Sequence, residues 1–210
     1  MRCVFFTSLL LSLLASAWAQ DYKVVTTSGG PPGIPAAFAA AVQTQGYSVS
    51  GPNGPWCEIW FRTGIPAGAK PADDAIVFPI PQGALVGVLR FPSEGADRRG
   101  QTIKAGIYTM RYSDYPVDGS HQGVAPQRDF LLLTPIASDP DPAATPAFEQ
   151  LVKMSTKASG TPHPAVFSIE KPNTSNFPSI TAEGDTPDEV LNVKIGDFPL
   201  AMIVVGKAQN

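Results

Sequence analysis

Histidine and cysteine are scarce in this sequence, which has two of each among 210 residues. The chain also lacks a Gly-x-Ser-x-Gly elbow, a Walker loop, and the Gly-x-Gly-x-x-Gly, His-Glu-x-x-His and Cys-x-x-Cys motifs. These absences disfavour the common families of nucleophilic hydrolases and zinc metalloproteases.

Charged residues are also few. They make up 16% of the chain, with 15 Lys and Arg against 18 Asp and Glu, a formal net charge of -3. So little charge argues against coiled coils, long helical bundles and disordered polyelectrolytes. A mildly acidic chain has no general attraction for phosphate backbones or anionic lipid, so nucleic acid is not expected as a partner.

Long apolar runs are absent except at the start of the chain. A basic residue at position 2, an apolar run over 4–15 and the small-x-small sequence at 17–19 are typical of a cleavable signal peptide. The run is short for a membrane span, and an uncleaved anchor is the alternative. We predict a signal peptide over 1–19 and an exported protein, periplasmic or secreted, with no transmembrane segment after signal cleavage.

Signal cleavage removes one of the two cysteines. The mature chain would run over 20–210, with Cys57 as its only thiol, so an intramolecular disulfide is excluded. No internal repeat or linker divides this stretch into two cores. A chain of this length can bury a core without a metal or a disulfide, and we predict one domain.

Proline and glycine are abundant. The 22 prolines and 19 glycines make up about one residue in five, against an average of roughly 12%. Their clusters separate short apolar segments, and this favours many short strands joined by turns. Strands are predicted at 47–50, 56–62, 84–91, 102–112, 129–134, 164–170, 189–195 and 200–205.

Two segments have helical features. Residues 34–45 begin near a proline and end before Gly46, which suits the left-handed conformation after a helix; residues 146–157 have apolar side chains at helical spacing and end before Gly160. Two helices are too few for a parallel α/β fold. We predict a mostly β fold, an antiparallel β-sandwich of about seven to eight strands with two short helices, in which 171–187 is a surface connection.

The strand over 56–62 alternates. Cys57, Ile59 and Phe61 share the face predicted to point into the core, and Trp56, Glu58 and Trp60 share the other. Packing beneath the first helix is one interpretation of the two tryptophans. The alternative is a carbohydrate-binding module, in which Trp56 and Trp60 stack on sugar rings and Glu58 binds hydroxyls.

The segment 103–108 ends in Gly-Ile-Tyr. It resembles the tyrosine corner of immunoglobulin-like and fibronectin type III sandwiches, in which the Tyr hydroxyl bonds back to the preceding backbone. The resemblance implies that Tyr108 is buried and hydrogen-bonded. Such a corner fixes topology rather than chemistry.

A broader resemblance covers most of the mature chain. The segments at 57–60, 99–112, 118–130 and 159–164 look like those of an uncharacterised family of exported bacterial proteins, a domain of unknown function. The resemblance implies a bacterial protein in a periplasmic or secreted setting. It implies no activity and no catalytic residues.

Polar residues gather in loops near predicted strand ends, where binding groups usually lie. The candidate ligand-binding residues are Asp97, Arg99, Gln101, Asp118, His121 and Arg128. The connection over 113–128 is long for a hairpin, and we expect it to fold back so that His121 and Arg128 approach the 97–101 loop. The alternative is that Asp97-Arg98 and Arg128-Asp129 are local ion pairs that hold the loops.

A metal site is a further hypothesis. Cys57, His121 and His163 with one carboxylate could hold copper or zinc, but their spacings fit no compact ligand motif. No cofactor is therefore predicted. The sequence favours a noncatalytic exported protein that binds an unknown small molecule, a glycan or an envelope protein. The alternative is a small metal-binding protein or enzyme with a site centred on His121.

Overall fold

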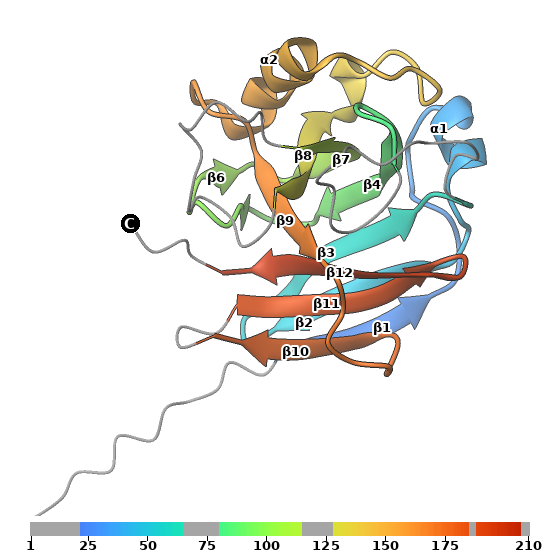
Figure 1. Ribbon diagram of the computed structural model, residues 1–210, viewed down its shortest axis with the longest axis vertical. Helices are drawn as coiled ribbons and strands as arrows, with labels where there is room; N and C mark the ends of the chain where they lie inside the picture. Colours follow the sequence, from blue (N-terminus) through green and yellow to red (C-terminus); the bar gives the residue numbers. More distant parts are fainter. Residues whose placement is uncertain (1–21, 65–79, 115–127, 185–187, 207–210) are drawn as a thin grey trace, which may run out of the picture.

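The computed structural model describes residues 22–64, 80–114, 128–184 and 188–206. Ten strands form one antiparallel sheet (Figure 1). In their order across the sheet they are β1 (Lys23–Thr27), β2 (Gly46–Gly51), β3 (Gly54–Phe61), β4 (Leu85–Phe91), β7 (Gly106–Asp114), β8 (Asp129–Pro135), β9 (Val166–Glu170), β12 (Phe198–Val205), β11 (Asp188–Ile195) and β10 (Ser179–Glu183).

The remaining elements are short. A small hairpin pairs β5 (Gly95–Ala96) with β6 (Thr102–Ile103). The described helices are α1 (Ala36–Ala41), α2 (Phe148–Ser159) and the 3-10 turn η1 (Ile136–Ser138). None of them is long and apolar enough to cross a membrane.

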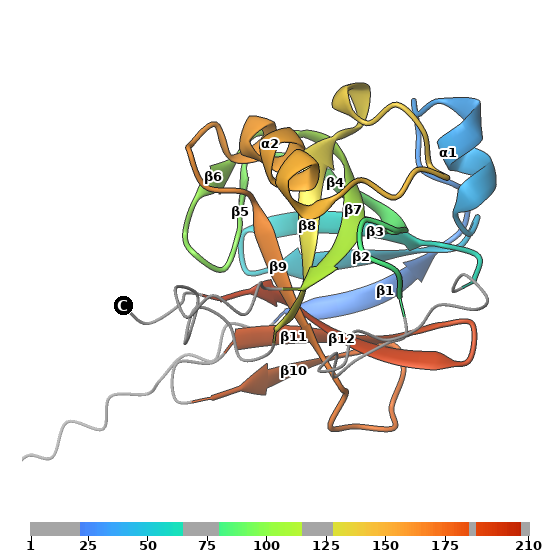
Figure 2. The same ribbon diagram turned by 45° about the horizontal axis from the view of Figure 1, so that its top comes forward.

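The sheet bends until its two ends meet. Figures 1 and 2 show β10, β11 and β12 lying over β1 and β2, and the end strands β1 and β10 contact each other. Apolar side chains from both halves fill the space between them. Val49 on β2, Leu131 on β8, Val193 on β11 and Met202 on β12 all belong to this one core and have no exposed surface.

The structure confirms the predicted mostly β, antiparallel fold with two helices. Its main sheet has ten strands, however, and not the seven or eight expected of the sandwich. One reason is β9, which joins the part of the sheet that ends in β8 to the part that begins with β12. Its first residues pair with β8, as in Leu131 opposite Phe167, and its last residues pair with β12, as in Met202 opposite Ile169. A strand that changes partners along its length makes one sheet out of two packed layers.

The short strand β5 was not predicted, and neither were two strands of the ten-stranded sheet. The strand β1 was not identified, and β10 lies inside the stretch expected to be a surface connection. Both are five-residue strands at the ends of the sheet, and none of their residues is fully buried. They therefore lack the continuous or alternating apolar pattern from which strands are predicted.

The first helix is shorter than its sequence predicts. It ends at Ala41 because Val42 forms a β-bridge with Arg62 and the Gln43 amide donates to the Phe61 carbonyl. Gly46 does not adopt the predicted left-handed conformation. A Cβ there would lie 2.5 Å from Trp60 Nε1, so the close approach of the indole requires the glycine.

The second helix follows its prediction closely. It covers β8, and Gly160 ends it with the expected left-handed conformation, at φ 66°. Leu151 packs against Phe130 and Leu132, while Leu131 and Leu133 face the main core. The run of apolar residues in β8 therefore reflects burial on both faces, as its lack of alternation predicts.

The tyrosine corner is present. Tyr108 is 5% exposed, and its hydroxyl donates to the Lys104 carbonyl at 2.8 Å. This contact confirms the prediction made from the Gly-Ile-Tyr sequence. The wider resemblance to immunoglobulin-like sandwiches stays a prediction.

Tyr108→Phe is expected to lower the free energy of unfolding by about 1 kcal/mol, because the substitution removes one hydrogen bond and leaves the Lys104 carbonyl without that donor. Urea denaturation of the two proteins measures the difference. Tyr47→Phe is the control, since no side-chain hydrogen bond of the Tyr47 hydroxyl to a described residue is seen. Equal losses of stability in the two variants would show that the Tyr108 hydrogen bond does not stabilise the protein.

The predicted core face of β3 is also confirmed. Cys57, Ile59 and Phe61 are each at most 1% exposed. Burial raises the pKa of the Cys57 thiol well above its ordinary value, and the nearby Glu58 carboxylate adds to the shift. The thiolate, which is the reactive form, is therefore disfavoured in the folded protein.

We expect Cys57 to resist Ellman's reagent in the native state and to react once denaturant is added. The reaction rate is followed by absorbance across a urea series, and the onset of labelling should coincide with the unfolding transition. Rapid labelling without denaturant would place the thiol outside the core.

Candidate functional site

The 97–101 loop is built around a buried carboxylate. Asp97 is 2% exposed, and its Oδ1 accepts from the backbone amides of Arg99 at 3.0 Å and Gln101 at 2.9 Å. Its Oδ2 accepts from Gln101 Nε2 at 2.7 Å and from the Val166 amide at 3.3 Å. Asp97, predicted to bind a ligand, has its carboxylate engaged in closing this loop and joining it to β9.

Gln101 ties the same loop to the chain that follows α2. Its Nε2 also donates to the Pro164 carbonyl at 2.9 Å, and its Oε1 accepts from the Thr161 hydroxyl. Ser159 Oγ on α2 donates to the His163 carbonyl, which fixes the next turn of chain. Two segments about sixty residues apart in the sequence are therefore held side by side by a continuous hydrogen-bond network.

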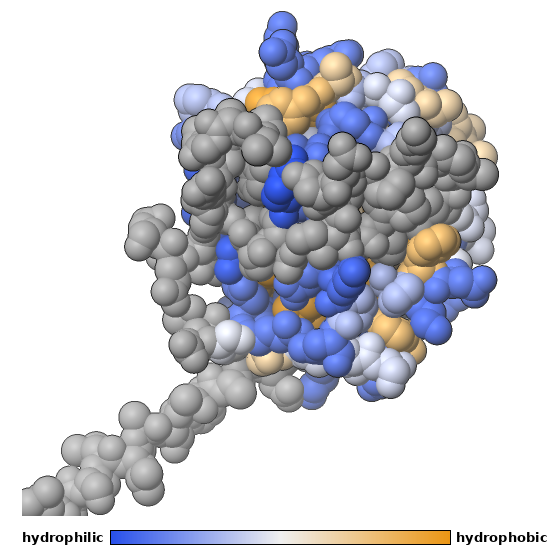
Figure 3. Space-filling view, in the orientation of Figure 1, coloured by the Kyte–Doolittle hydropathy of each residue, from blue (hydrophilic) through white to orange (hydrophobic). Residues whose placement is uncertain are grey.

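This network positions a small cavity beside α2. The cavity has a volume of about 220 Å³ and is lined by Arg99, Phe130, Phe148, Val152, Pro162, His163, Pro164 and Val166. Apolar side chains from β8, β9 and α2 make up half of the lining, and two prolines from the chain after α2 add to its apolar part. Figure 3 shows apolar surface over α2, the helix that supplies two of these side chains.

Arg99 and His163 are the two polar side chains of this cavity. Both residues are exposed, and neither the guanidinium nor the imidazole has a hydrogen-bond or ion-pair partner within the described ranges. A carboxylate close to this guanidinium would form an ion pair with it. The arrangement offers a cation and an imidazole above an apolar floor, which suits an amphipathic anion.

Arg128 does not line this cavity, and it forms an ion pair with Asp114 at 3.3 Å across the ends of β7 and β8. Arg98 pairs with Asp188 at 2.8 Å. Ion pairs therefore hold both segments, as the alternative expected, and the partners seen are Asp188 for Arg98 and Asp114 for Arg128. Asp129 accepts from the Tyr112 hydroxyl at 2.6 Å.

Asp118 and His121 fall outside the described residues, as does most of the 113–128 connection. The predicted approach of His121 to the 97–101 loop therefore stays a prediction, together with the enzyme or metal site centred on it.

The two tryptophans do not share a face. A register shift between Val49 and Ser50 turns Trp56 inward, where its indole lies edge-on to Phe91 at 5.6 Å and donates to the Val204 carbonyl at 2.9 Å. Trp60 is 4% exposed and packs with Val42 beyond the end of α1.

Glu58 is engaged in an ion pair with Arg90 at 2.6 Å. The three residues Trp56, Glu58 and Trp60 therefore form no common exposed surface, and packing near the first helix accounts for Trp60. The bulge beside Trp56 is the physical reason why simple alternation misplaced it.

The residues named for a metal are also separated. Cys57 is buried in the core, whereas His163 is exposed after α2. No group of three or more His, Cys, Asp or Glu side chains that could hold a metal occurs among the residues that the structure describes.

Comparisons of the chain with models of protein families, with curated proteins and with solved structures find no match. The polar loop in the sequence identified Arg99 as a candidate. The apolar side chains of the cavity floor were not identified, because the sequence pattern assigned them to the core face of α2 and to β8.

Proposed function

We propose that this protein is exported and that it binds a small amphipathic carboxylate, without catalysis, in the cavity between Arg99 and His163. The signal-like sequence over 1–19 supports export to a periplasmic or secreted location. The observation that supports binding is the pair of unpartnered polar side chains above an apolar floor.

The chemistry of the lining selects the class of ligand. A guanidinium binds a carboxylate through parallel hydrogen bonds, and an adjacent imidazole can donate to the same group. The side chains of Phe130, Phe148 and Val152 offer apolar contact to the rest of the molecule. A ligand with one anionic end and one apolar body satisfies both parts.

The size of the cavity limits that body. A volume of about 220 Å³ corresponds to the liquid volume of about seven water molecules. This is room for one ring with a short acidic arm. The hydrogen bonds of Asp97 and Gln101 fix the loop in advance, which lowers the entropy lost on binding.

Two features support a noncatalytic role. The described residues that line the cavity include no Ser, Thr, Cys, Asp, Glu or Lys, and so they supply no common nucleophile next to the His163 imidazole. The carboxylate nearest in the sequence, Asp97, is occupied by four donors. The residues that line the cavity are therefore suited to binding a ligand without catalysis.

Phenylacetate is the probe for this proposal, and isothermal titration calorimetry is the measurement. We expect a Kd of about 1 mM or tighter for the native protein. Arg99→Gln should weaken binding about tenfold, because it removes a charge-assisted hydrogen bond. Lys153→Gln is the matched control: it removes the same charge from an exposed position on α2, next to Val152 but outside the lining.

The neutral analogue phenylacetamide separates charge from apolar contact. It should bind the native protein and Arg99→Gln equally weakly. Equal phenylacetate affinities for Arg99→Gln and Lys153→Gln would show that only general charge attracts the probe, and the proposal would be withdrawn.

A further inference from the structure

Three acidic side chains lie close together near the end of β10. Glu170 is the last residue of β9, Glu183 is the last residue of β10, and Asp188 begins β11 directly opposite Glu183. Figures 1 and 2 show the chain after β9 running past β12 and β11 before it turns back into β10. The carboxyl group of Glu170 contacts that of Glu183 by a hydrogen bond, although β12 and β11 separate their strands in the sheet.

Two other side chains fix the position of Glu183. Its Oε1 accepts from Asn173 Nδ2 at 2.9 Å and from the Thr181 hydroxyl at 3.0 Å. Asn173 belongs to the 171–178 connection between β9 and β10, so Glu183 joins this connection to the end strand of the sheet. Ionised carboxyl groups only accept hydrogen bonds, and the contact of Glu183 with Glu170 therefore requires a proton on one of the two.

The surroundings of Glu170 oppose a second negative charge. Among the residues that the structure describes, the charged groups that face it are Glu183 on β10, Asp188 on β11 and Arg98 on the loop between β5 and β6. Arg98 is engaged elsewhere, because its Nε and Nη2 donate to Asp188 Oδ2 at 3.0 Å and 2.8 Å. The strand β12, which pairs with Glu170, carries no charged residue. The one facing cation is therefore already shared with a carboxylate.

This arrangement favours the protonated form of Glu170. Burial raises the pKa of Glu170, the carboxylates of Glu183 and Asp188 raise it further, and Arg98 opposes them. A glutamate with a pKa raised by folding stabilises the folded state in its protonated form. That contribution is complete below the pKa of the unfolded chain, and it is lost as the pH rises through the higher pKa of the folded protein.

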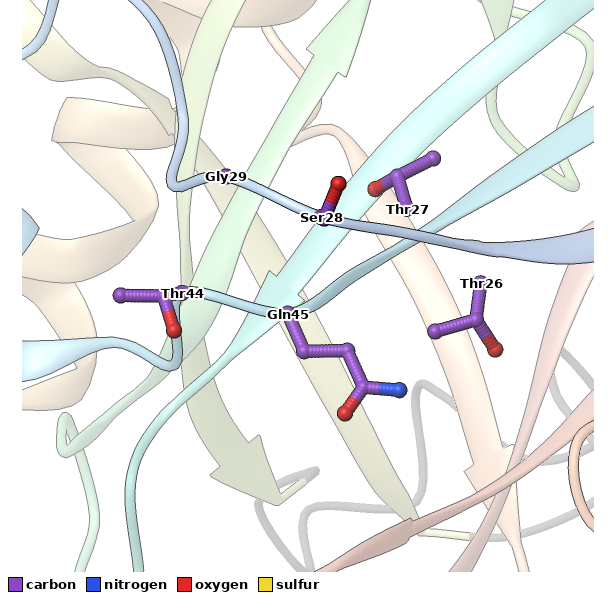
Figure 4. Close-up of a pocket in the computed structure, with 6 residues that line it drawn as sticks. All are labelled: Thr26, Thr27, Ser28, Gly29, Thr44 and Gln45. Carbon is purple, nitrogen blue, oxygen red and sulfur yellow. The ribbon is translucent and has the colours of Figure 1, made fainter.

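We propose that Glu170 and Glu183 form a pH-sensitive switch that holds the 171–178 connection against β10 in acid and releases it as the pH rises. While Glu170 is protonated, its carboxyl group donates to the Glu183 carboxylate. Once it is ionised, the two carboxylates repel each other and the contact opens. The switch uses no residue of the Arg99 cavity. The pocket between β1 and β2 in Figure 4, which is lined by uncharged residues, contributes no group to it either.

Urea denaturation of the native protein and of Glu170→Gln, at about pH 4 and at about pH 8, tests the switch. Glutamine keeps the shape of the side chain and can donate to Glu183 at either pH. The two proteins should unfold at the same urea concentration in acid. At the higher pH the variant should unfold at a higher concentration, because only the native protein carries the unfavourable carboxylate. Glu94→Gln, the same change at an exposed position, is the control, and its difference from the native protein should not depend on pH.

Amide hydrogen exchange shows whether the connection itself opens. At about pH 8 the amides of residues 171–178 should exchange faster in the native protein than in Glu170→Gln, and at about pH 4 the two proteins should match. Carboxyl NMR of Glu170 adds a direct titration, whose midpoint should fall in Glu183→Gln. The proposal is overturned if Glu170→Gln is no more stable than the native protein at the higher pH, if exchange over 171–178 is the same in both, or if Glu183→Gln leaves the Glu170 midpoint unchanged.

Discussion

Arg111→Met is expected to lower the free energy of unfolding by about 3 to 5 kcal/mol. Arg111 and Asp139 have no exposed side-chain surface, and the guanidinium meets the carboxylate twice, at 2.6 Å and 2.8 Å. The substitution leaves the Asp139 carboxylate buried without its cation. Among the residues that the structure describes, only the Thr109 hydroxyl, at 2.6 Å, would remain as a side-chain donor to it.

The same guanidinium also joins separate parts of the chain. Arg111 donates to the Gly83 carbonyl at 2.7 Å and to the Asp141 and Ala144 carbonyls at 2.6 Å. These bonds attach the connection before α2 to β7 and to the turn before β4. Loss of Arg111 therefore leaves three backbone acceptors without this donor as well as one carboxylate.

Urea denaturation of Arg111→Met measures this loss, and Arg90→Met is its control. Arg90 makes an ion pair with Glu58 at the same distance of 2.6 Å, but the two side chains are 38% and 27% exposed. Solvent screens such a pair, so the control should change stability by less than about 1 kcal/mol. Similar losses in the two variants would contradict the special role of the buried pair.

Asp97→Ala is expected to lower the free energy of unfolding by about 2 to 3 kcal/mol. The buried carboxylate accepts from the backbone amides of Arg99, Gln101 and Val166, and alanine leaves these donors without their acceptor. The Arg99 loop would also lose its fixed shape. Phenylacetate binding at a temperature where the variant is folded should therefore weaken.

Glu94→Ala is the control for this prediction. It removes one carboxylate from an exposed position three residues earlier in the chain, and we expect a change within about 0.5 kcal/mol. Chemical denaturation gives the stabilities, and calorimetry gives the phenylacetate affinities. If Asp97→Ala matched Glu94→Ala in both measurements, Asp97 would have no role in shaping the cavity.

The parts of the fold that could be predicted depend on neighbours in the sequence. The run of apolar residues in β8, the helical spacing over α2 and the Gly-Ile-Tyr corner each carry a local pattern, and each formed as expected. The change of partners along β9 depends on β8 and β12, which are distant in the chain. No local pattern encodes it, so one continuous sheet was mistaken for a sandwich.

The candidate site, too, could be predicted only where it depends on residues that are close in the sequence. Polar residues at a strand end identified the 97–101 loop, but they could not distinguish Asp97, which turns inward, from Arg99, which stays exposed. The contact of Gln101 with the Thr161 hydroxyl brings His163 to the same cavity from a distant part of the chain. That convergence is a product of the tertiary fold.

The central claim is that the Arg99 cavity binds a small amphipathic carboxylate. A titration of the ¹⁵N-labelled protein with phenylacetate, followed by amide chemical shifts, tests it most directly. We expect saturable shifts concentrated at Arg99, Val152, His163 and Val166, which all line the cavity. Shifts that do not saturate, or that gather at residues outside this lining, would contradict it.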